Sequence, residues 1–407
     1  MKKKSTISLL AMLSVISIIL SGCGNTGTKG NTNETSAPKE IVIGNIGAMS
    51  GPSASLGKAQ SQGVDLAVKE INANGGILGA QIKIVKRDDE ADPTKSKTYV
   101  EELVDKEKVK FIIGPTNSTP AAASIAYLQQ NKIISILPIA TSTTLMSKDN
   151  PYAFRLLPSN FIQAKSLVTI AAKKGYKNIA LVADTSALGV DGMSVMEATL
   201  KEVGISPAVK VTFKSDDQDM TPVAQKIKDA NADVALFWTL GADGAKIVRA
   251  LERLDYIANV DIIGYTGLVM ANFKELAGPG ASQCAAVGIK NWALADGKTE
   301  LAPKYQDMYK KIIAEYGPYE PGKRDTNPST VASGYDAIYL LKWAIEKAGT
   351  TDADAVKNVL ETNVNEYESG FVSKYVFSKD SHEGYSPNDM VPVAIGEMIN
   401  GDLYKQK

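Results

Sequence analysis

The stretch Glu70-Ile71-Asn72-Ala73-Asn74-Gly75-Gly76-Ile77-Leu78-Gly79 joins a segment of helical periodicity to a short β-rich run. Two adjacent glycines tolerate backbone angles that other residues rarely adopt, so Gly75 and Gly76 predict a tight turn. The β-rich run at 82–87 is followed by Asp88-Asp89 and then by Asp92-Pro93. The stretch therefore predicts a helix, a turn and a strand in immediate succession.

The same alternation of strand and helix extends along most of the chain. It occurs twice, from residue 41 to about 157 and from about 177 to 290, with Arg155-Leu156-Leu157-Pro158 as a plausible crossing between the halves. Strands alternating with helices predict α/β lobes, each a parallel sheet covered on both faces. Candidate strands lie at 41–46, 82–87, 111–113, 133–136, 179–183, 208–213, 234–238 and 261–265, and candidate helices at 63–72, 96–106, 121–130, 163–174, 191–203, 222–230 and 245–254. Residues 301–347 are mostly helical, and residues from 370 onward, Tyr375-Val376-Phe377 included, mix β and turn character.

The N-terminus has the layout of a secretory signal. Lys2, Lys3 and Lys4 precede an apolar run at 7–20, which is shorter than the roughly 20 residues of a spanning helix. The run ends at Leu20-Ser21-Gly22-Cys23, which resembles the bacterial lipobox, whose cysteine is acylated. We expect a signal peptide at 1–22 and, at 23–39, lipidated Cys23 with a polar tether; a transmembrane anchor and an unmodified cysteine are the alternatives.

Composition excludes several function classes. Lys plus Arg and Asp plus Glu both number 45, so no excess charge favours nucleic acid.

The 368 residues that remain after the tether (407 minus 39) are more than one hydrophobic core usually supports, and two domains are expected. Cys284 has no intramolecular partner once Cys23 is lipidated, and we expect a buried thiol. His382 is the only histidine, expected to be solvated in a polar turn, so a catalytic triad or multi-histidine metal site is not supported.

A nucleotide-dependent enzyme is the first rival interpretation. Gly44, Gly47 and Gly51 follow or flank a strand, but their spacing is not that of the dinucleotide-binding glycines. No phosphate-binding loop ending in Gly-Lys-Ser or Gly-Lys-Thr is present. We therefore expect a protein that is not an enzyme and that uses no cofactor and no metal.

Several motifs carry a family resemblance that covers residues from about 40 to 400. Besides the opening stretch, they are Gly47-Ala48-Met49-Ser50-Gly51-Pro52, Ile112-Ile113-Gly114-Pro115, Tyr335-Asp336-Ala337-Ile338-Tyr339, and Asp219 with Pro222. With these motifs the chain resembles the branched-chain amino-acid (Leu/Ile/Val) binding proteins, the type I extracytoplasmic solute-binding family of ABC transporters. The resemblance implies two doubly wound parallel-sheet lobes joined by three crossing segments. Lobe 1 would comprise 40–158 plus 288–373, and lobe 2 would comprise 159–287 plus 374–407.

Ligands of open α/β sheets bind beyond the carboxyl ends of the strands, so the loops there are the candidate site. Asn117, Ser118 and Thr119 precede the helix near Pro120, and hydroxyls and free amides at a helix N-terminus suit a carboxylate. An ordinary helix cap is the alternative, and the resemblance favours carboxylate binding. It also implies that the segment Ile139-Ala140-Thr141 contributes a backbone carbonyl and a threonine hydroxyl.

The chain departs from the family pattern at positions that matter for the ligand. Leucine-binding members place aromatic side chains where this chain has Leu56 and Leu188. Thr266 stands where the resemblance implies an acidic partner for the ligand ammonium, and a buried ammonium without a carboxylate is unfavourable. Either the ligand lacks an α-ammonium group, or another acid substitutes, the candidates being Asp184, Asp191 and Asp243. Trp238 could add an aromatic wall to the cleft or belong to the core.

The resemblance implies an extracytoplasmic, lipid-anchored monomer that captures a small amino acid or related carboxylate by lobe closure and delivers it to an ABC permease. Its contact with the membrane would be through the lipid alone, and no nucleic acid is expected. The second rival interpretation is a ligand-sensing lipoprotein that uses the same fold to signal to a membrane partner. Neighbouring permease and ATPase genes would favour transport over sensing.

Overall fold

The computed structural model describes residues 40–215, 217–269, 273–295, 298–318, 320, 326–385, 390–399 and 403–406. They all belong to one compact unit, Ala37–Lys407. The expected signal peptide, Cys23 and the tether lie outside the described residues. None of the helices in the described part of the chain is long and apolar enough to cross a membrane.

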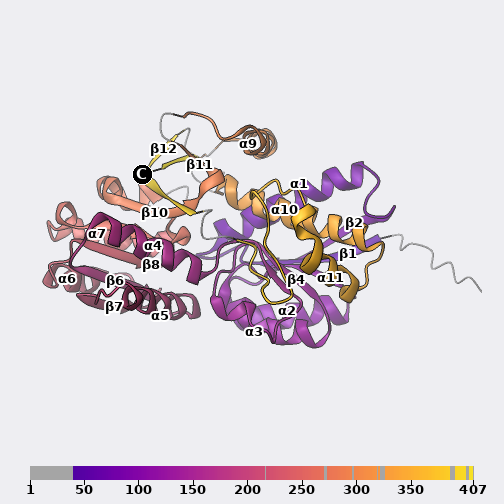
Figure 1. Ribbon diagram of the computed structural model, residues 1–407, viewed down its shortest axis with the longest axis horizontal. Coiled ribbons are helices and arrows are strands. Elements are labelled where there is room, and N and C mark those ends of the chain that lie inside the picture. The colour runs from indigo at the N-terminus through magenta and orange to yellow at the C-terminus, as the bar shows by residue number, and fades with distance from the viewer. Residues whose placement is uncertain are drawn as a thin grey trace, which may run out of the picture. The chain divides into compact units, whose positions relative to one another are not determined.

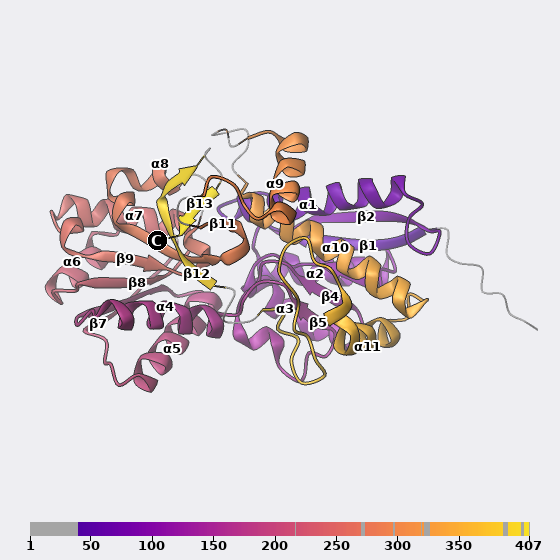
Figure 2. The ribbon, with the colours of Figure 1, turned by 45° about the horizontal axis from the view of Figure 1, so that its top comes forward.

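The first sheet is entirely parallel and has the strand order β2-β1-β3-β4-β5. Helices α1 and α10 lie on one face and α2 and α3 on the other (Figures 1 and 2). Strands and helices of this half are β1 (Glu40–Gly47), α1 (Ala54–Ala73), β2 (Gln81–Asp88), α2 (Pro93–Asp105), β3 (Phe111–Ile113), α3 (Ser118–Gln130), β4 (Ile134–Leu137) and β5 (Ala153–Arg155). The later helices are α9 (Pro303–Tyr316), α10 (Pro328–Ala348) and α11 (Ala353–Asn363).

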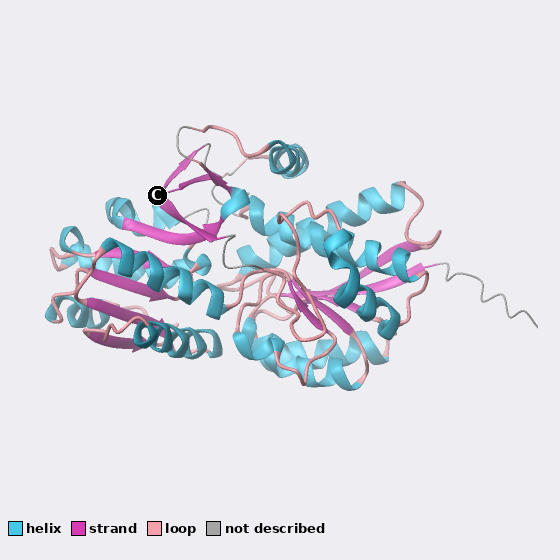
Figure 3. Cartoon of the chain, viewed as in Figure 1, coloured by secondary structure: helices cyan, strands magenta, loops and turns pink. Residues whose placement is uncertain are grey.

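The second sheet has the order β11-β13-β12-β10-β9-β8-β6-β7. The strands β6 to β10 run parallel, whereas β12 is antiparallel to both β10 and β13. Figure 3 shows helices on both faces of this sheet. The elements are α4 (Asn160–Lys174), β6 (Ile179–Asp184), α5 (Ala187–Glu202), β7 (Val209–Phe213), α6 (Thr221–Asp229), β8 (Val234–Trp238), α7 (Gly241–Arg253), β9 (Asp261–Gly264), α8 (Phe273–Ala277), β10 (Cys284–Ile289), β11 (Ala293–Leu294), β12 (Met390–Ile399) and β13 (Leu403–Gln406).

The opening stretch forms the predicted helix, turn and strand. Gly75 and Gly76 both have positive φ, at 96° and 79°, and a Cβ on Gly76 would lie 1.9 Å from the carbonyl oxygen of Ala80. The Asn72 side chain joins helix to strand, since its Oδ1 accepts from the Ile82 N–H (2.8 Å) and its Nδ2 donates to the Ile82 carbonyl (2.9 Å). The turn therefore needs glycine for backbone conformation and for space.

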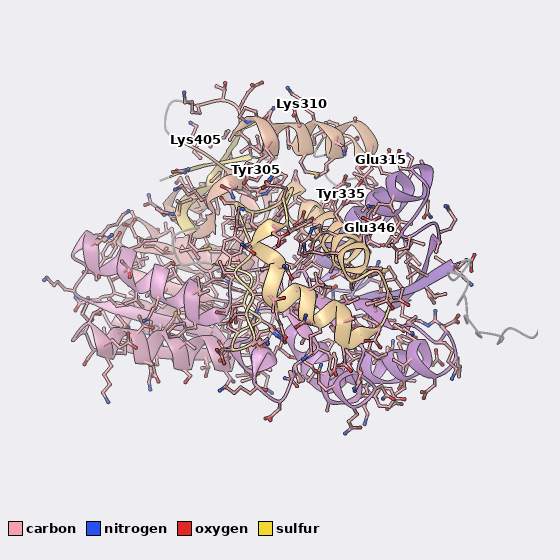
Figure 4. All side chains as sticks on the ribbon, turned by 45° about the vertical axis from the view of Figure 1, so that its right-hand side comes forward. Tyr305, Lys310, Glu315, Tyr335, Glu346 and Lys405 are labelled. Atoms are coloured by element: carbon pink, nitrogen blue, oxygen red, sulfur yellow. The ribbon has the colours of Figure 1, made fainter. Side chains whose placement is uncertain are left out.

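Glu70 connects the opening stretch with the Tyr335 to Tyr339 motif of α10. Its Oε2 accepts hydrogen bonds from the hydroxyls of Tyr335 (2.5 Å) and Tyr339 (3.0 Å), and from Lys311 Nζ of α9 (3.1 Å). Tyr335, labelled in Figure 4, also stacks on Tyr339 with ring centroids 4.6 Å apart. Burial acts to raise the pKa of Glu70, but these hydrogen bonds and Lys311 outweigh it and lower that pKa. Two motifs far apart in sequence thus form one polar cluster between α1 and α10.

The structure contains strands that the sequence pattern did not predict, namely β5, β10 and β11, whereas β12 and β13 lie in the stretch from 370 onward that was expected to mix β and turn residues. β5 has only three residues, and β10 reads Cys-Ala-Ala-Val-Gly-Ile, whose alanines and glycine have low strand propensity. The segment at 375–377 forms no strand, and instead Tyr375 stacks on Phe377 within the core of the first sheet. Cys284 is 1 % exposed, which confirms the predicted burial of its thiol, and its Sγ donates to the Gly280 carbonyl oxygen (3.5 Å).

His382 is only 8 % exposed, so its interpretation as a solvated turn residue is wrong. Its ring stacks on Phe154 with centroids 4.0 Å apart, Nδ1 lies 2.9 Å from the Ala153 carbonyl oxygen, and Nε2 lies 3.1 Å from Glu361 Oε1. Burial lowers the pKa of His382 below its ordinary value of 6.5, although Glu361 opposes the shift. The folded state therefore favours the neutral imidazole.

This burial predicts a pH dependence of stability. Because the folded-state pKa of His382 is lowered, its contribution is present above the unfolded pKa of about 6.5 and is lost as the pH falls toward the folded value. We expect the free energy of unfolding to fall more steeply below pH 6.5 in the wild type than in a His382→Gln variant. Urea unfolding between pH 7.5 and 5 measures both slopes, and equal slopes would contradict the prediction.

Candidate ligand-binding site

A pocket collects loops from the carboxyl ends of strands of both sheets, where ligands of open α/β sheets bind. We call it the neutral pocket, because none of its lining side chains, all in the described part of the chain, is charged. The N-termini of α3 and α10 also contribute. Its lining residues are Leu56, Thr116, Asn117, Ser118, Ile139, Ala140, Thr141, Leu157, Leu188, Leu240, Tyr265, Thr266, Gly267, Val269, Gly288, Ile289, Asn327, Ser329 and Thr330.

A second pocket shares part of this wall and contains charges. We call it the charged pocket, after Glu90, Asp184, Asp243 and Lys246, which line it. The two pockets have in common Leu56, Asn117, Ser118, Leu188, Leu240 and Gly267. They are therefore neighbouring parts of one cleft with different chemistry.

The structure brings eight of the ten predicted site residues together in the neutral pocket: Leu56, Asn117, Ser118, Ile139, Ala140, Thr141, Leu188 and Thr266. Thr119 lines the charged pocket instead. Consecutive residues at a helix start point in different directions, and Ser118 lines both pockets whereas Thr119 lines the charged pocket alone.

Trp238 lines neither pocket, so its interpretation as an aromatic wall is wrong. It is fully buried and packs against Gly192 of α5, where a Cβ would lie 2.1 Å from its ring. The Trp238 ring stacks on Tyr265 with centroids 4.6 Å apart, and Tyr265 lines the neutral pocket. The aromatic contribution to the pocket therefore comes from Tyr265.

Ser118 fixes the loop after β4 against the start of α3. Its Oγ accepts hydrogen bonds from the backbone N–H groups of Thr141 (3.3 Å) and Ser142 (3.2 Å). Thr141 is 5 % exposed, and its hydroxyl has no hydrogen-bond partner among the described residues. Asn117, the N-cap of α3, makes no side-chain capping bond, and its buried Oδ1 is also unpartnered within the described part of the chain. This side of the pocket thus offers unused hydrogen-bonding groups at a helix N-terminus.

The loop after β9 presents neutral polar groups. Thr266 donates both its N–H (3.0 Å) and its hydroxyl (2.7 Å) to Gln163 Oε1, and Gln163 Nε2 donates to the Pro158 carbonyl (2.7 Å). Tyr265 is 2 % exposed, and burial raises its pKa well above the ordinary value of 10.0. Its hydroxyl therefore stays protonated.

The three aspartates considered as ammonium partners lie outside the neutral pocket. Asp191 Oδ2 accepts from the Thr143 N–H (2.7 Å) and from Asn160 Nδ2 (2.6 Å). Asp184 accepts from the N–H and hydroxyl of Ser186. Asp243 forms an ion pair of 2.9 Å with Lys246.

Arg155 supports the cleft from the predicted crossing segment. It is fully buried, its Nη1 donates to the Ser142 carbonyl (2.8 Å), and its Nη2 lies 2.9 Å from Glu383 Oε1. Burial lowers the pKa of Arg155 and raises that of Glu383, while their mutual attraction opposes both shifts. The pair joins the loop that carries Thr141 to the returning chain.

Sequence reasoning missed the wall formed by Asn327, Ser329 and Thr330 at the start of α10. Asn327 caps this helix, with its Oδ1 accepting from the Ser329 N–H at 2.9 Å. The signal was present, since Asn327-Pro328-Ser329-Thr330 has the same composition as Asn117-Ser118-Thr119-Pro120 in a different order. The other missed wall residues are Thr116, Leu157, Leu240, Tyr265, Gly267, Val269, Gly288 and Ile289.

A family model described as periplasmic binding protein matches residues 40–397. The chain belongs to this family. Among curated relatives, it is 29 % identical to the Leu/Ile/Val-binding protein BraC3 of Rhizobium johnstonii, over 80 % of this chain and 84 % of the relative. This confirms the resemblance to the branched-chain amino-acid binding proteins and, with it, an extracytoplasmic solute-binding protein.

Solved structures of periplasmic binding proteins confirm the type I fold. A periplasmic binding protein type 1 from Bordetella pertussis superposes with a TM-score of 0.79 at 26 % identity, covering 90 % of this chain and 99 % of that one. The substrate-binding protein LivJ from Streptococcus pneumoniae, solved with isoleucine, gives 0.75 at 24 % identity, covering 91 % and 99 %. The described residues also contain no cluster of three or more His, Cys, Asp or Glu side chains that could hold a metal ion.

Proposed function

We propose that this periplasmic binding protein is the substrate-binding component of an ABC importer. It captures a small amino acid or related carboxylate in the neutral pocket and delivers it to a membrane permease. The observation that carries the proposal is the unpartnered Thr141 hydroxyl beside the N-terminus of α3, in a pocket lined from both sheets. A helix N-terminus attracts negative charge, and a buried hydroxyl without a partner favours a ligand that supplies one.

In the proposed mechanism, the ligand carboxylate first binds lobe 1 (40–158 plus 288–373), at Thr141 and the start of α3. Lobe 2, which carries the second sheet, then closes over the ligand with Leu188 and Tyr265, which line the same pocket. Closure replaces water around the ligand by fixed dipoles and apolar side chains, so the ligand stabilises the closed state. The permease would recognise that closed state.

The proposed lipid anchor at Cys23 would hold the two-lobed binding protein at the membrane. The polar tether at 24–39 comprises 16 residues. As a flexible coil it would reach about 22 Å on average, with longer excursions. Such a tether would keep a monomeric binding protein close to its permease while leaving it free to turn and dock.

Replacing Thr141 by valine tests the carboxylate site. Because a hydrogen bond to a charged group contributes about 1.5–3 kcal/mol, we expect Thr141→Val to weaken binding about 10- to 100-fold. Calorimetric titration with leucine and with its deaminated analogue 4-methylpentanoate measures the change in affinity for whichever of the two compounds binds.

Thr119→Val is the matched control, because it makes the same chemical change in the charged pocket. We expect it to alter the affinity by less than about threefold, since it removes no hydroxyl from the neutral pocket. If Thr141→Val bound as tightly as the wild type, the carboxylate site would lie elsewhere.

A further inference from the structure

An α-amino acid brings two opposite charges into its site, and each must be satisfied when water is removed. A buried ammonium group needs a carboxylate or several acceptors, because its desolvation is otherwise strongly unfavourable. The neutral pocket supplies no carboxylate from the described residues. Thr266, in the loop after β9, already donates its hydroxyl and its N–H to Gln163.

The nearest acids are held by other groups. Asp191 binds Thr143 and Asn160 and lines neither pocket. Asp184 binds Ser186, and Asp243 is paired with Lys246, both in the charged pocket. An ammonium group in the neutral pocket would therefore have to draw on an acid that already has a partner in the fold.

Two unused hydroxyls of the neutral pocket suit an anion with an apolar body, whereas Asn117 Oδ1, unpartnered in the described part of the chain, is an acceptor for a hydrogen-bond donor of the ligand. Two side chains more than nine-tenths buried, Thr141 and Tyr265, have hydroxyls without a hydrogen-bond partner among the described residues. The raised pKa of Tyr265 keeps its hydroxyl a donor. Both donors, together with the N–H groups at the start of α3, favour acceptor oxygens on the ligand. The rest of the wall combines neutral polar side chains with aliphatic ones, and the aliphatic part is formed by Leu56, Leu157, Leu188, Leu240, Val269, Ile139 and Ile289.

We propose that the ligand is a carboxylate with an apolar body and no ammonium group. This inference rests on the proposed function. The carboxylate lies at Thr141 and the start of α3. Tyr265 hydrogen-bonds to the carboxylate or to a further oxygen of the ligand, and the aliphatic wall encloses the body. Amino acids of the same shape are rejected because their ammonium group loses its water without gaining a carboxylate partner.

The test compares matched pairs that differ in the ammonium group alone. The purified protein is titrated with leucine and 4-methylpentanoate, valine and 3-methylbutanoate, and phenylalanine and 3-phenylpropanoate, after a thermal-shift screen of the same compounds. We expect the best-bound deaminated acid to bind at least about 100-fold more tightly than its amino acid. An amino acid that binds as tightly as its deaminated partner would overturn the inference and leave the proposed function standing.

Thr266→Glu supplies the missing carboxylate, with Thr266→Gln as a neutral control of similar size. We expect the glutamate variant to gain at least about tenfold in affinity for the amino acid and to lose affinity for the deaminated acid through charge repulsion. The glutamine variant should keep the wild-type ratio of the affinities for the deaminated acid and the amino acid. If Thr266→Glu changed the ratio of the two affinities no more than Thr266→Gln does, the inference would be wrong. If no acid and no amino acid of the panel bound the wild type, the proposed function itself would fail.

Discussion

Replacing Asp336 by alanine is expected to lower the free energy of unfolding by about 3–5 kcal/mol, because it leaves several buried donors without an acceptor. Asp336 lies in the middle of α10 and is 1 % exposed. Its carboxylate accepts from the hydroxyls of Tyr367 (2.8 Å), Ser369 (2.6 Å) and Tyr375 (2.6 Å), and from the Gly370 N–H (2.8 Å). Burial raises the pKa of Asp336, although these hydrogen bonds oppose the shift. One side chain thus holds the returning chain at 367–375 against α10.

Urea unfolding of the purified protein measures this loss. Asp336→Asn keeps one acceptor oxygen and the size of the side chain, so we expect a smaller loss than for alanine. Tyr375→Phe removes a single donor together with its need for an acceptor, and should cost about 1 kcal/mol. An Asp336→Ala variant as stable as the wild type would show that the cluster contributes little.

Arg155→Met is expected to cost a similar amount, about 3–5 kcal/mol, because it breaks a buried ion pair from one side. Glu383 would lose the guanidinium that lies 2.9 Å away, and the Ser142 carbonyl would lose its donor. Since Ser142 follows Thr141 in the loop after β4, we also expect this variant to bind the ligand more weakly.

The partner Glu383 provides the control. Arg155→Met combined with Glu383→Met leaves neither charge buried alone, so the double variant should lose at least about 1 kcal/mol less than the sum of the two single variants. Denaturant unfolding of all four proteins measures this coupling. Additive losses would indicate that the two charges act independently in the fold.

The sequence predicted most of the parallel framework, for a physical reason. β1, β3, β4, β6, β8 and β9 are short, almost fully buried runs rich in Ile, Val, Leu and Phe, which the apolar pattern reveals directly. The antiparallel return of β12 onto β10 was not predicted, because β10 contains alanines and glycine and its partner lies more than 100 residues away. Pairing over such a distance leaves no local signal.

The site residues that follow a strand end were predictable. Aromatic residues that can either pack in the core or line the cleft were less so. Asn117, Ser118 and Thr141 follow β3 and β4 directly, so the topology places them in the pocket. Trp238 and Tyr265 are both aromatic residues at strand ends, yet Trp238 fills the space left by Gly192 while Tyr265 reaches the pocket. The sequence pattern does not show that space, because it depends on the packing of α5 against β8.

The position of a bound carboxylate tests the proposed ligand site most directly. The decisive measurement is a crystal structure of the protein with the deaminated acid that raises its melting temperature most. We expect the carboxylate within hydrogen-bond distance of the Thr141 hydroxyl and of the first N–H groups of α3, with the apolar body against Leu56 and Leu188. A carboxylate bound in the charged pocket beside Lys246, with the neutral pocket empty, would contradict the account.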